Sequence, residues 1–317
     1  MMERETNLIK VLVVDDSAFM RKIISDILQS DSEIQVMDTA KNGQEAIKKM
    51  KQHKPDVITL DVEMPVMDGL SCLKELLKID HIPIIMLSSL TKNGAEATIH
   101  ALEKGAVDFI TKPVNIFSMT GDDVKKELIE KIKIAKKIAK NSIKIRKAEP
   151  QTLQKAPKHD IVKSSNIKNI IAIGTSTGGP KALQNVVPLI PGDIPAAVLI
   201  VQHMPPGFTK SLAERLNNMS EVTVKEAEDG EDVKPGYVYI APGDYHMMVE
   251  RYTGSKLRIR LSKAPPVGAH RPSVDVMMES LSDTGLTNII GVIMTGMGGD
   301  GSEGVKKLKH INNGYII

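Results

Sequence analysis

The chain has 317 residues, of which 41% are hydrophobic and 26% are charged, a composition ordinary for a globular protein of two domains. Because the sequence has no apolar run of 18 residues and begins with MMERETNLIK, we expect neither a membrane-spanning helix nor a secretory signal. A net charge of +3 gives no argument for nucleic-acid binding, and a lone cysteine, Cys72, suits a reducing cytoplasm.

The first third of the chain alternates short apolar runs with segments of helical spacing. The strand-like runs are residues 11–16, 34–40, 57–62, 83–89 and 107–113. The helix-like segments between them are residues 17–30, 42–54, 68–79 and 93–105, and we expect Cys72 to be buried in the third. Runs that are apolar throughout indicate strands covered on both faces. The pattern therefore predicts a small doubly wound (βα)5 domain with its sites at the carboxyl ends of the strands.

Polar side chains stand where these predicted strands end, namely Asp15, Asp16, Asp61, Ser88 and Lys112. Three carboxylates at neighbouring strand ends repel one another unless a cation lies among them, and oxygen ligands favour Mg²⁺. A lysine pairs with phosphate as a point charge, and a carboxylate can act as the nucleophile that forms an acyl phosphate. Each residue alone also suits an ordinary turn. Their order along successive strand ends favours a magnesium-dependent phosphorylation site.

The motifs DVEMPVMDG and TKP make residues 8–128 resemble the receiver domains of two-component response regulators. The resemblance implies a flavodoxin-like fold and phosphorylation of Asp61 by a histidine kinase. It also implies that Mg²⁺ is bound by Asp15, Asp16, Asp61 and the backbone carbonyl of Glu63. The residues that respond to the phosphoryl group are, by the same resemblance, Ser88, Lys112 and the reorienting aromatic Phe109.

Residues 122–147 are rich in lysine and keep a helical spacing, which predicts a fifth helix extended outward. Since no aromatic residue lies among these lysines for stacking on bases, we interpret them as a solvated helix face and not as a nucleic-acid patch. The polar, aperiodic stretch that follows reads as a linker. The predicted division is a receiver domain at 1–128, a helix extension and linker at 129–165, and a second domain at 166–317.

The second domain begins with IIAIGTSTGGPKAL, in which an apolar run breaks into a glycine-rich turn. A Walker phosphate loop would need lysine where Pro180 stands, and the spacing does not fit GxGxxG. The pattern GxSxG does fit, with small residues that allow a tight bend at Ser176, and Pro180 suits the first turn of the next helix. The turn therefore predicts a nucleophilic serine.

A nucleophilic serine needs an imidazole base and a group that orients this base. His203 directly follows the apolar run AAVLIVQ and is the favoured base, with His270 next. Asp300 lies in the glycine-rich turn of IIGVIMTGMGGDG and is the favoured acid, although it can also cap the helix that follows. The three residues stand after three predicted strands, whose carboxyl ends an open sheet can bring together.

The motifs GTSTGGP, VQHMPPGFT, YIAPGDYHM and MTGMGGDG make nearly the whole chain similar to chemotaxis-type protein-glutamate methylesterases, the CheB family. This family carries its triad in the order Ser176, His203, Asp300, whereas the α/β-hydrolase order would need Asp244 and His270. The resemblance implies a cytoplasmic, phosphorylation-regulated serine esterase with a mostly parallel, doubly wound α/β domain. It would hydrolyse glutamate methyl esters on methyl-accepting chemoreceptors, release methanol and also deamidate receptor glutamines, with no cofactor at the esterase site.

The same resemblance makes the backbone N–H of Met297 a candidate oxyanion donor, and Thr177 is a second candidate. Two alternatives remain, a response regulator with a DNA-binding output and a scaffold that has lost catalysis. The first would need a compact module with a basic recognition helix, and the second would not need to keep the triad. Because family members continue beyond NNGYII, we expect that the sequence ending at Ile317 is truncated.

Overall fold

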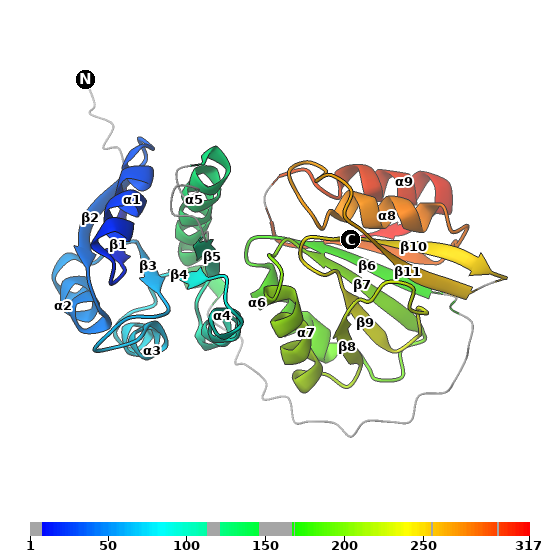
Figure 1. Cartoon of the computed structure of the whole chain (residues 1–317), viewed down its shortest axis with the longest axis horizontal. Coiled ribbons are helices and arrows are strands. Elements are labelled where there is room, and N and C mark those ends of the chain that lie inside the picture. Colours follow the sequence, from blue (N-terminus) through cyan, green and yellow to red (C-terminus); the bar gives the residue numbers. More distant parts are fainter. Residues whose placement is uncertain (1–7, 113–120, 146–166, 168, 255, 297) are drawn as a thin grey trace. The chain divides into compact units, whose positions relative to one another are not determined.

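The computed structural model of the chain describes residues 8–112, 121–145, 167, 169–254, 256–296 and 298–317. It divides into two units, Met1–Gln151 and Thr152–Ile317, which are described separately (Figure 1). The division falls inside the stretch expected to be a linker. Among the described residues, no helix has the length and apolar character needed to cross a lipid bilayer.

The first unit is a five-stranded parallel sheet of order β2-β1-β3-β4-β5. Its strands are β1 (Ile9–Val14), β2 (Ile34–Ala40), β3 (Val57–Asp61), β4 (Ile84–Ser89) and β5 (Asp108–Lys112). Its helices are α1 (Ala18–Gln29), α2 (Gly43–His53), α3 (Gly69–Ile79), α4 (Lys92–Lys104) and α5 (Asp122–Ile145). Helix α1 packs beside α5, and α3 lies between α2 and α4 (Figure 1). This is the flavodoxin-like order, so the predicted fold of this unit is confirmed.

Local sequence explains where the elements of this unit begin. The side chains of Ser17, Asn42 and Asp68 accept hydrogen bonds from the first turns of α1, α2 and α3 and so cap them. All five residues of β3 are buried, as expected for a strand covered on both faces. Cys72 is buried on α3, where burial raises the pKa of its thiol to about 12, with a smaller contribution from the charge of Asp68. This thiol is therefore a packing group, as predicted from the sequence.

The second unit contains a six-stranded parallel sheet of order β13-β12-β6-β7-β9-β8. These strands are β6 (Asn169–Thr175), β7 (Ala196–Gln202), β8 (Thr223–Glu226), β9 (Tyr237–Ile240), β12 (Ile289–Ile293) and β13 (Tyr315–Ile316). An antiparallel hairpin forms a separate sheet from β10 (His246–Thr253) and β11 (Lys256–Ser262). The helices are α6 (Gly179–Val186), the short 3-10 helix η2 (Val187–Leu189), α7 (Phe208–Met219), α8 (Val274–Ser282) and α9 (Ser302–Asn312).

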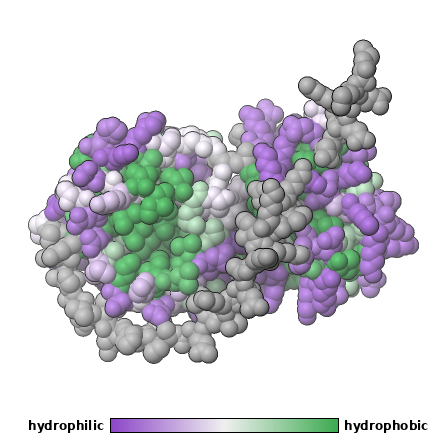
Figure 2. All heavy atoms as spheres, turned by 180° about the vertical axis from the view of Figure 1, so that it is seen from behind, coloured by the Kyte–Doolittle hydropathy of each residue, from purple (hydrophilic) through white to green (hydrophobic). Residues whose placement is uncertain are grey.

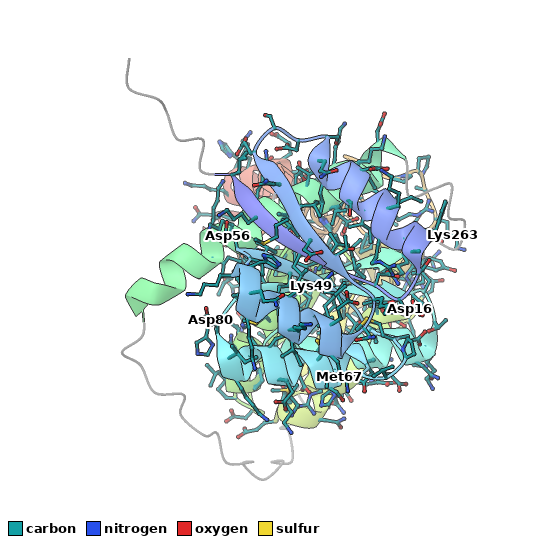
Figure 3. The ribbon with its side chains drawn as sticks, turned by 90° about the vertical axis from the view of Figure 1, so that its left-hand side faces the viewer. Asp16, Lys49, Asp56, Met67, Asp80 and Lys263 are labelled. Atoms are coloured by element: carbon teal, nitrogen blue, oxygen red, sulfur yellow. The ribbon has the colours of Figure 1, made fainter. Side chains whose placement is uncertain are left out.

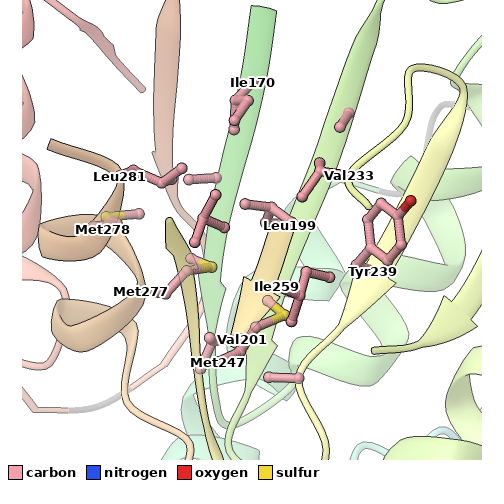
Figure 4. Close-up of a cluster of buried hydrophobic side chains, with 14 of the residues drawn as sticks. Ile170, Leu199, Val201, Val233, Tyr239, Met247, Ile259, Met277, Met278 and Leu281 are labelled. Atoms are coloured by element: carbon pink, nitrogen blue, oxygen red, sulfur yellow. The ribbon is translucent and has the colours of Figure 1, made fainter. Parts of the chain in front are cut away.

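The core of this unit lies between the central strands, the hairpin and α8. Figure 4 shows Ile170 and Leu199 of the sheet facing side chains from α8 and from the hairpin, among them Met277 and Met247. This core anchors the strands whose ends carry the candidate catalytic residues. Seen from behind, the unit also presents a broad apolar area (Figure 2).

Candidate active site and receiver site

In the first unit, three carboxylates and one ammonium group meet at the carboxyl edge of the sheet. Lys112 Nζ lies 2.7 Å from Asp15 Oδ2 and 2.7 Å from Asp61 Oδ2, and both carboxylates are buried. Asp16 is exposed, and one oxygen from each of the three carboxylates lies within 4.8 Å of the others. In Figure 3, Asp16 lies at one end of the sheet and Asp80 at the other. The structure thus brings together the acidic residues that the sequence placed at the strand ends.

Burial raises the pKa of Asp61 to about 6, the charge of Lys112 lowers it, and the charge of Asp15 raises it again. Burial alone would lower the pKa of Lys112, but the two carboxylates outweigh burial and raise it. Two buried carboxylates that share one ammonium group form an incompletely neutralised cluster. A hard divalent cation with oxygen ligands fits this donor set.

The predicted switch residues lie on the neighbouring strands. Ser88 is fully buried, and its hydroxyl donates a hydrogen bond of 3.0 Å to the carbonyl of Gly94 in α4. The Phe109 side chain is buried as well, with the Lys131 ammonium 5.2 Å from its ring centroid. The backbone N–H of Glu63 hydrogen-bonds to the Asp61 carboxylate, which helps to lower its pKa. The switching roles of these residues stay predictions, as does the metal-binding role of the Glu63 carbonyl.

In the second unit, two catalytic candidates directly follow adjacent strands. Ser176 follows β6, and His203 follows β7, which pairs with β6 as far as Thr175 and Gln202. Asp300 lies in the loop after β12, the other neighbour of β6. The chain places β7, β8 and β9 on one side of β6 and then returns to place β12 on the other side. The residues therefore meet at a topological switch point, where open α/β sheets carry their sites.

The three side chains form a continuous chain of contacts. Ser176 Oγ lies 3.2 Å from His203 Nδ1, and His203 Nε2 lies 2.7 Å from Asp300 Oδ2. The two ring nitrogens are exchanged relative to the chymotrypsin-type arrangement, in which Nε2 faces the serine. Proton transfer is compatible with either orientation, because a neutral imidazole carries one donor and one acceptor nitrogen. The arrangement can activate a serine hydroxyl.

In the described part of the chain, Asp300 has four hydrogen-bond partners. Besides His203, its carboxylate accepts bonds from the Ser273 hydroxyl at 2.7 Å and from the backbone N–H groups of Val274 at 2.7 Å and Asp275 at 3.0 Å. Burial raises the pKa of Asp300, but the bonds from these partners outweigh burial and hold the pKa well below its ordinary value. Asp300 is therefore an ionised carboxylate facing the imidazole.

The interpretation of Asp300 as the cap of the following helix is wrong. Helix α9 begins after Gly301, which makes no side-chain cap hydrogen bond. Asp300 instead accepts from the first turn of a different helix, α8, whose N-cap residue is Ser273. The carboxylate thus stabilises the N-terminus of α8 electrostatically while it contacts His203.

Backbone contacts fix the turn that carries Ser176. Gln202 is buried, and its side-chain amide donates to the carbonyls of Ser176 at 3.0 Å and His203 at 3.2 Å, which ties the two catalytic segments together. The left-handed residue of the turn is Gly178, with φ 74°, rather than the serine itself. A side chain at Gly296 would press on the nucleophile, since an added Cβ would lie 2.9 Å from Ser176 Cβ. Sequence reasoning did not identify Gln202 or Gly296.

Comparison with known proteins places this site in a family. Residues 171–317 match the model described as CheB methylesterase, and residues 11–121 match the response regulator receiver domain. The chain is 52% identical over 302 residues to the protein-glutamate methylesterase/protein-glutamine glutaminase of Halalkalibacterium halodurans, covering 95% of this chain and 85% of that protein. The chain belongs to the CheB methylesterase family.

Two further members illustrate the similarity. A protein-glutamate methylesterase/protein-glutamine glutaminase 1 of Syntrophomonas wolfei is 46% identical over 311 residues, covering 97% of this chain and 88% of that protein. The crystal structure of the Thermotoga maritima CheB methylesterase catalytic domain is 48% identical, covers 47% of this chain and 77% of that chain, and has a TM-score of 0.45. The family match through residue 317 does not support the alternative of a DNA-binding output module.

Three other candidate residues of this CheB-family chain make contacts of their own in the second unit. The ring of His270, the second candidate for the base, stacks on the ring of His203. Asp244, which the α/β-hydrolase order would need, forms an ion pair with Arg271. Thr177 is buried, and its carbonyl accepts a hydrogen bond of 2.9 Å from the Thr295 hydroxyl. Met297, the first candidate oxyanion donor, lies outside the described residues.

Proposed function

We propose that this protein is a phosphorylation-regulated protein-glutamate methylesterase that removes methyl groups from chemoreceptor glutamates and also deamidates receptor glutamines. The observation that carries the proposal is the contact chain from Ser176 through His203 to Asp300, in a chain that belongs to the CheB methylesterase family. The substrates are the cytoplasmic helices of methyl-accepting receptors, so the protein acts in the cytoplasm. The reaction converts an ester and water into a carboxylic acid and methanol.

In the first half-reaction, the Ser176 hydroxyl gives its proton to His203 Nδ1 while Oγ attacks the side-chain ester carbonyl. The tetrahedral intermediate collapses when Nδ1–H protonates the departing methoxide, which leaves as methanol. In the second half-reaction, His203 takes a proton from water as the water attacks the acyl-serine bond. The proton then returns to Ser176 Oγ, and the free glutamate is released. Deamidation follows the same steps with ammonia as the leaving group.

Asp300 supports both half-reactions as a permanent anion. His203 gains a positive charge each time it accepts a proton, and the carboxylate 2.7 Å from Nε2 stabilises that charge. The hydrogen bonds that lower the pKa of Asp300 keep it from taking the proton itself. The same bonds fix its position relative to the imidazole.

Backbone N–H groups stabilise the oxyanion of the tetrahedral intermediate. The N–H of Ser176 is already used, since it donates to the Thr295 carbonyl at 3.0 Å. The N–H of Thr177 follows the nucleophile directly, the usual place for one donor in a GxSxG turn. We assign the second donor to Met297. Each such donor contributes about 3 kcal/mol to transition-state stabilisation.

In the first unit, a chemotaxis histidine kinase is the phosphodonor and Asp61 is the phosphoryl acceptor. Mg²⁺ would be held by Asp15, Asp16, Asp61 and the carbonyl of Glu63, and when bound it neutralises charge on the incoming phosphoryl oxygens. The fit of this cation is supported by the clustered carboxylate oxygens and by the raised pKa of Asp61. Ser88 and Lys112 hold the phosphoryl group, and the added charge shifts the receiver between two states that control esterase activity.

The decisive experiment mixes the purified protein with receptor membranes that carry labelled methyl esters and measures volatile methanol. We expect methanol release from the wild type and a loss of about 10⁴-fold or more in Ser176→Ala, which lacks the nucleophile. The control is Ser211→Ala, which changes a half-buried serine of α7 whose hydroxyl donates to the Gly207 carbonyl. Wild-type protein that releases no methanol, or Ser176→Ala that retains activity, would contradict the proposal.

A further inference from the structure

The face of the His203 ring is covered by a second imidazole, that of His270. The two ring centroids lie 3.8 Å apart, and the ring planes differ by 9°. The edges of the His203 ring are already engaged by Ser176 and Asp300. We propose that His270 is a positioning residue that fixes the plane of the His203 ring during catalysis, an inference that rests on the proposed esterase function.

Two hydrogen bonds in the plane of an imidazole do not fix that plane completely. The His203 ring can tilt about the line that joins its two nitrogens while both contacts keep nearly the same length. The side-chain torsion that sets the ring plane of histidine has broad minima, so it does not prevent this tilt. A flat ring stacked on one face opposes the tilt by direct contact. His270 therefore supplies the restraint that the hydrogen bonds to Ser176 and Asp300 leave out.

The loop that carries His270 is itself anchored. The neighbouring Arg271 forms an ion pair with Asp244 and donates hydrogen bonds to the carbonyls of Lys263 at 3.2 Å and Ala264 at 3.0 Å. The backbone N–H and carbonyl of His270 also form hydrogen bonds with the backbone carbonyl and N–H of the residue three positions earlier. These two bonds close a tight turn. A stacked ring on a tethered loop can restrain its neighbour, which a ring on a free loop cannot do.

The restraint acts on the chemical steps, because His270 stacks on the base that transfers the proton. His203 must keep Nδ1 aimed at Oγ as it accepts the proton and must then aim the same nitrogen at the leaving group. Small misorientations of a catalytic group reduce rates steeply. An aromatic stack contributes free energy equivalent to a change of up to about tenfold in rate, so we expect an effect of this size.

The test compares three variants of the whole protein, His270→Phe, His270→Leu and His270→Ala. Phenylalanine keeps a flat ring, leucine has similar bulk without one, and alanine removes the stack. Two rates are measured, methanol release from methyl-labelled receptor membranes and covalent labelling of Ser176 by a fluorophosphonate, which reports on the nucleophile without any receptor. Melting temperatures are measured alongside, since a role in stability alone would move these and not the rates of the folded variants.

We expect His270→Ala and His270→Leu to lose about tenfold in both rates, with His270→Phe within about twofold of the wild type. Equal rates for alanine and wild type, or equal losses for leucine and phenylalanine, would overturn the inference. If the wild type is labelled at Ser176 but releases no methanol, the proposed function fails while the labelling series still judges the role of His270. If methanol is released and the variants do not differ in rate, the inference fails alone.

Discussion

Asp61 and Asp300 are both buried carboxylates near the carboxyl edge of a parallel sheet, yet their pKa values are shifted in opposite directions. Burial raises the pKa of both. At Asp300, bonds from His203, two backbone N–H groups and a hydroxyl outweigh burial. At Asp61, the charge of Lys112 and one backbone bond do not outweigh burial and the neighbouring charge of Asp15. The opposite directions therefore follow from the additional hydrogen-bond donors at Asp300 and from the neighbouring charge of Asp15 at Asp61.

This difference suits the two proposed tasks. A carboxylate that stabilises a histidine cation must stay ionised through every turnover, and fixed backbone donors ensure this. A carboxylate that accepts a phosphoryl group and binds a cation benefits from being incompletely neutralised, because the incoming cation then relieves an existing electrostatic cost. The carboxylate of the esterase site is therefore fixed in charge and position, whereas the charge around the receiver carboxylate can change when a cation or a phosphoryl group binds.

Among the changes that test this comparison of the two carboxylates, the largest effect is expected from Asp300→Asn. The amide cannot stabilise the imidazolium as an anion does, so methanol release should fall by about 10²–10⁴-fold. The amide also places one N–H₂ group opposite the donors of α8, which should lower the free energy of unfolding by about 1–2 kcal/mol. Activity is measured by methanol release and stability by thermal melting.

Ser273→Ala is the matched control for Asp300→Asn. It removes the N-cap side chain of α8 and one bond to Asp300 while leaving the carboxylate in place. We expect a comparable loss of stability with a much smaller loss of activity. If Asp300→Asn lowered the melting temperature while keeping wild-type activity, Asp300 would have a capping role only.

The second prediction concerns the receiver carboxylate as a switch. With Mg²⁺ present, a small phosphodonor should raise methanol release from the whole protein by about tenfold, as a shift from a minor to a dominant active state allows. Asp61→Asn should remove this response and leave the basal rate unchanged. Asp80→Asn, at the opposite end of the same sheet, is the control and should respond like the wild type (Figure 3). A response that persists in Asp61→Asn would place the phosphoryl acceptor elsewhere.

The smallest expected effect is on stability, and its sign is opposite to that at Asp300. A raised pKa means that the folded state holds a proton on Asp61 up to about pH 6, while the unfolded chain loses it near the ordinary aspartate pKa of 3.8. The contribution of this group to stability is therefore present at low pH and is lost as the pH rises through about 6. At neutral pH without Mg²⁺, Asp61→Asn should stabilise the first unit by about 1–2 kcal/mol.

Thermal melting of Asp61→Asn from pH 4 to pH 8 checks this prediction. The gain over the wild type should be largest above pH 6 and should shrink toward pH 4, where the carboxyl is protonated in the folded state and about half protonated in the unfolded state. Adding Mg²⁺ should stabilise the wild type more than the variant and so reduce the difference. A variant less stable than the wild type at neutral pH would show that the ion pair with Lys112 outweighs the repulsion from Asp15.

The sequence was informative wherever local pattern determines structure. Apolar runs predicted all five strands of the first unit, and the residues after them meet at one edge because parallel strands end together. Ser176 and His203 could be identified in the same way, since each directly follows an apolar run. Their contact required only that the two strands be adjacent, as they are.

Relations between distant segments were not predictable from local pattern. Asp300 precedes α9 in the sequence, so the sequence suggested a cap for that helix, but the fold brings the N-terminus of α8 to the carboxylate instead. His270 remained a candidate base beside His203 because the sequence does not show which of the two histidines contacts the serine and which one stacks on the other ring. The antiparallel hairpin β10–β11 was likewise not predicted, because its apolar alternation gives no indication that it leaves the main sheet.

Asp300 contacts both His203 and the first turn of α8, so the geometry of the triad also depends on whether this turn is closed. Helix ends are the parts of a helix that open most readily, and they do so without global unfolding. Each time the first turn of α8 frays, the N–H groups of Val274 and Asp275 leave the carboxylate, and the partner of His203 loses its fixed position. The lifetime of the assembled triad can therefore be no longer than the lifetime of that single helical turn. The rate of amide hydrogen exchange at these two residues would report, in the folded protein, how often this turn opens and the triad loses its geometry.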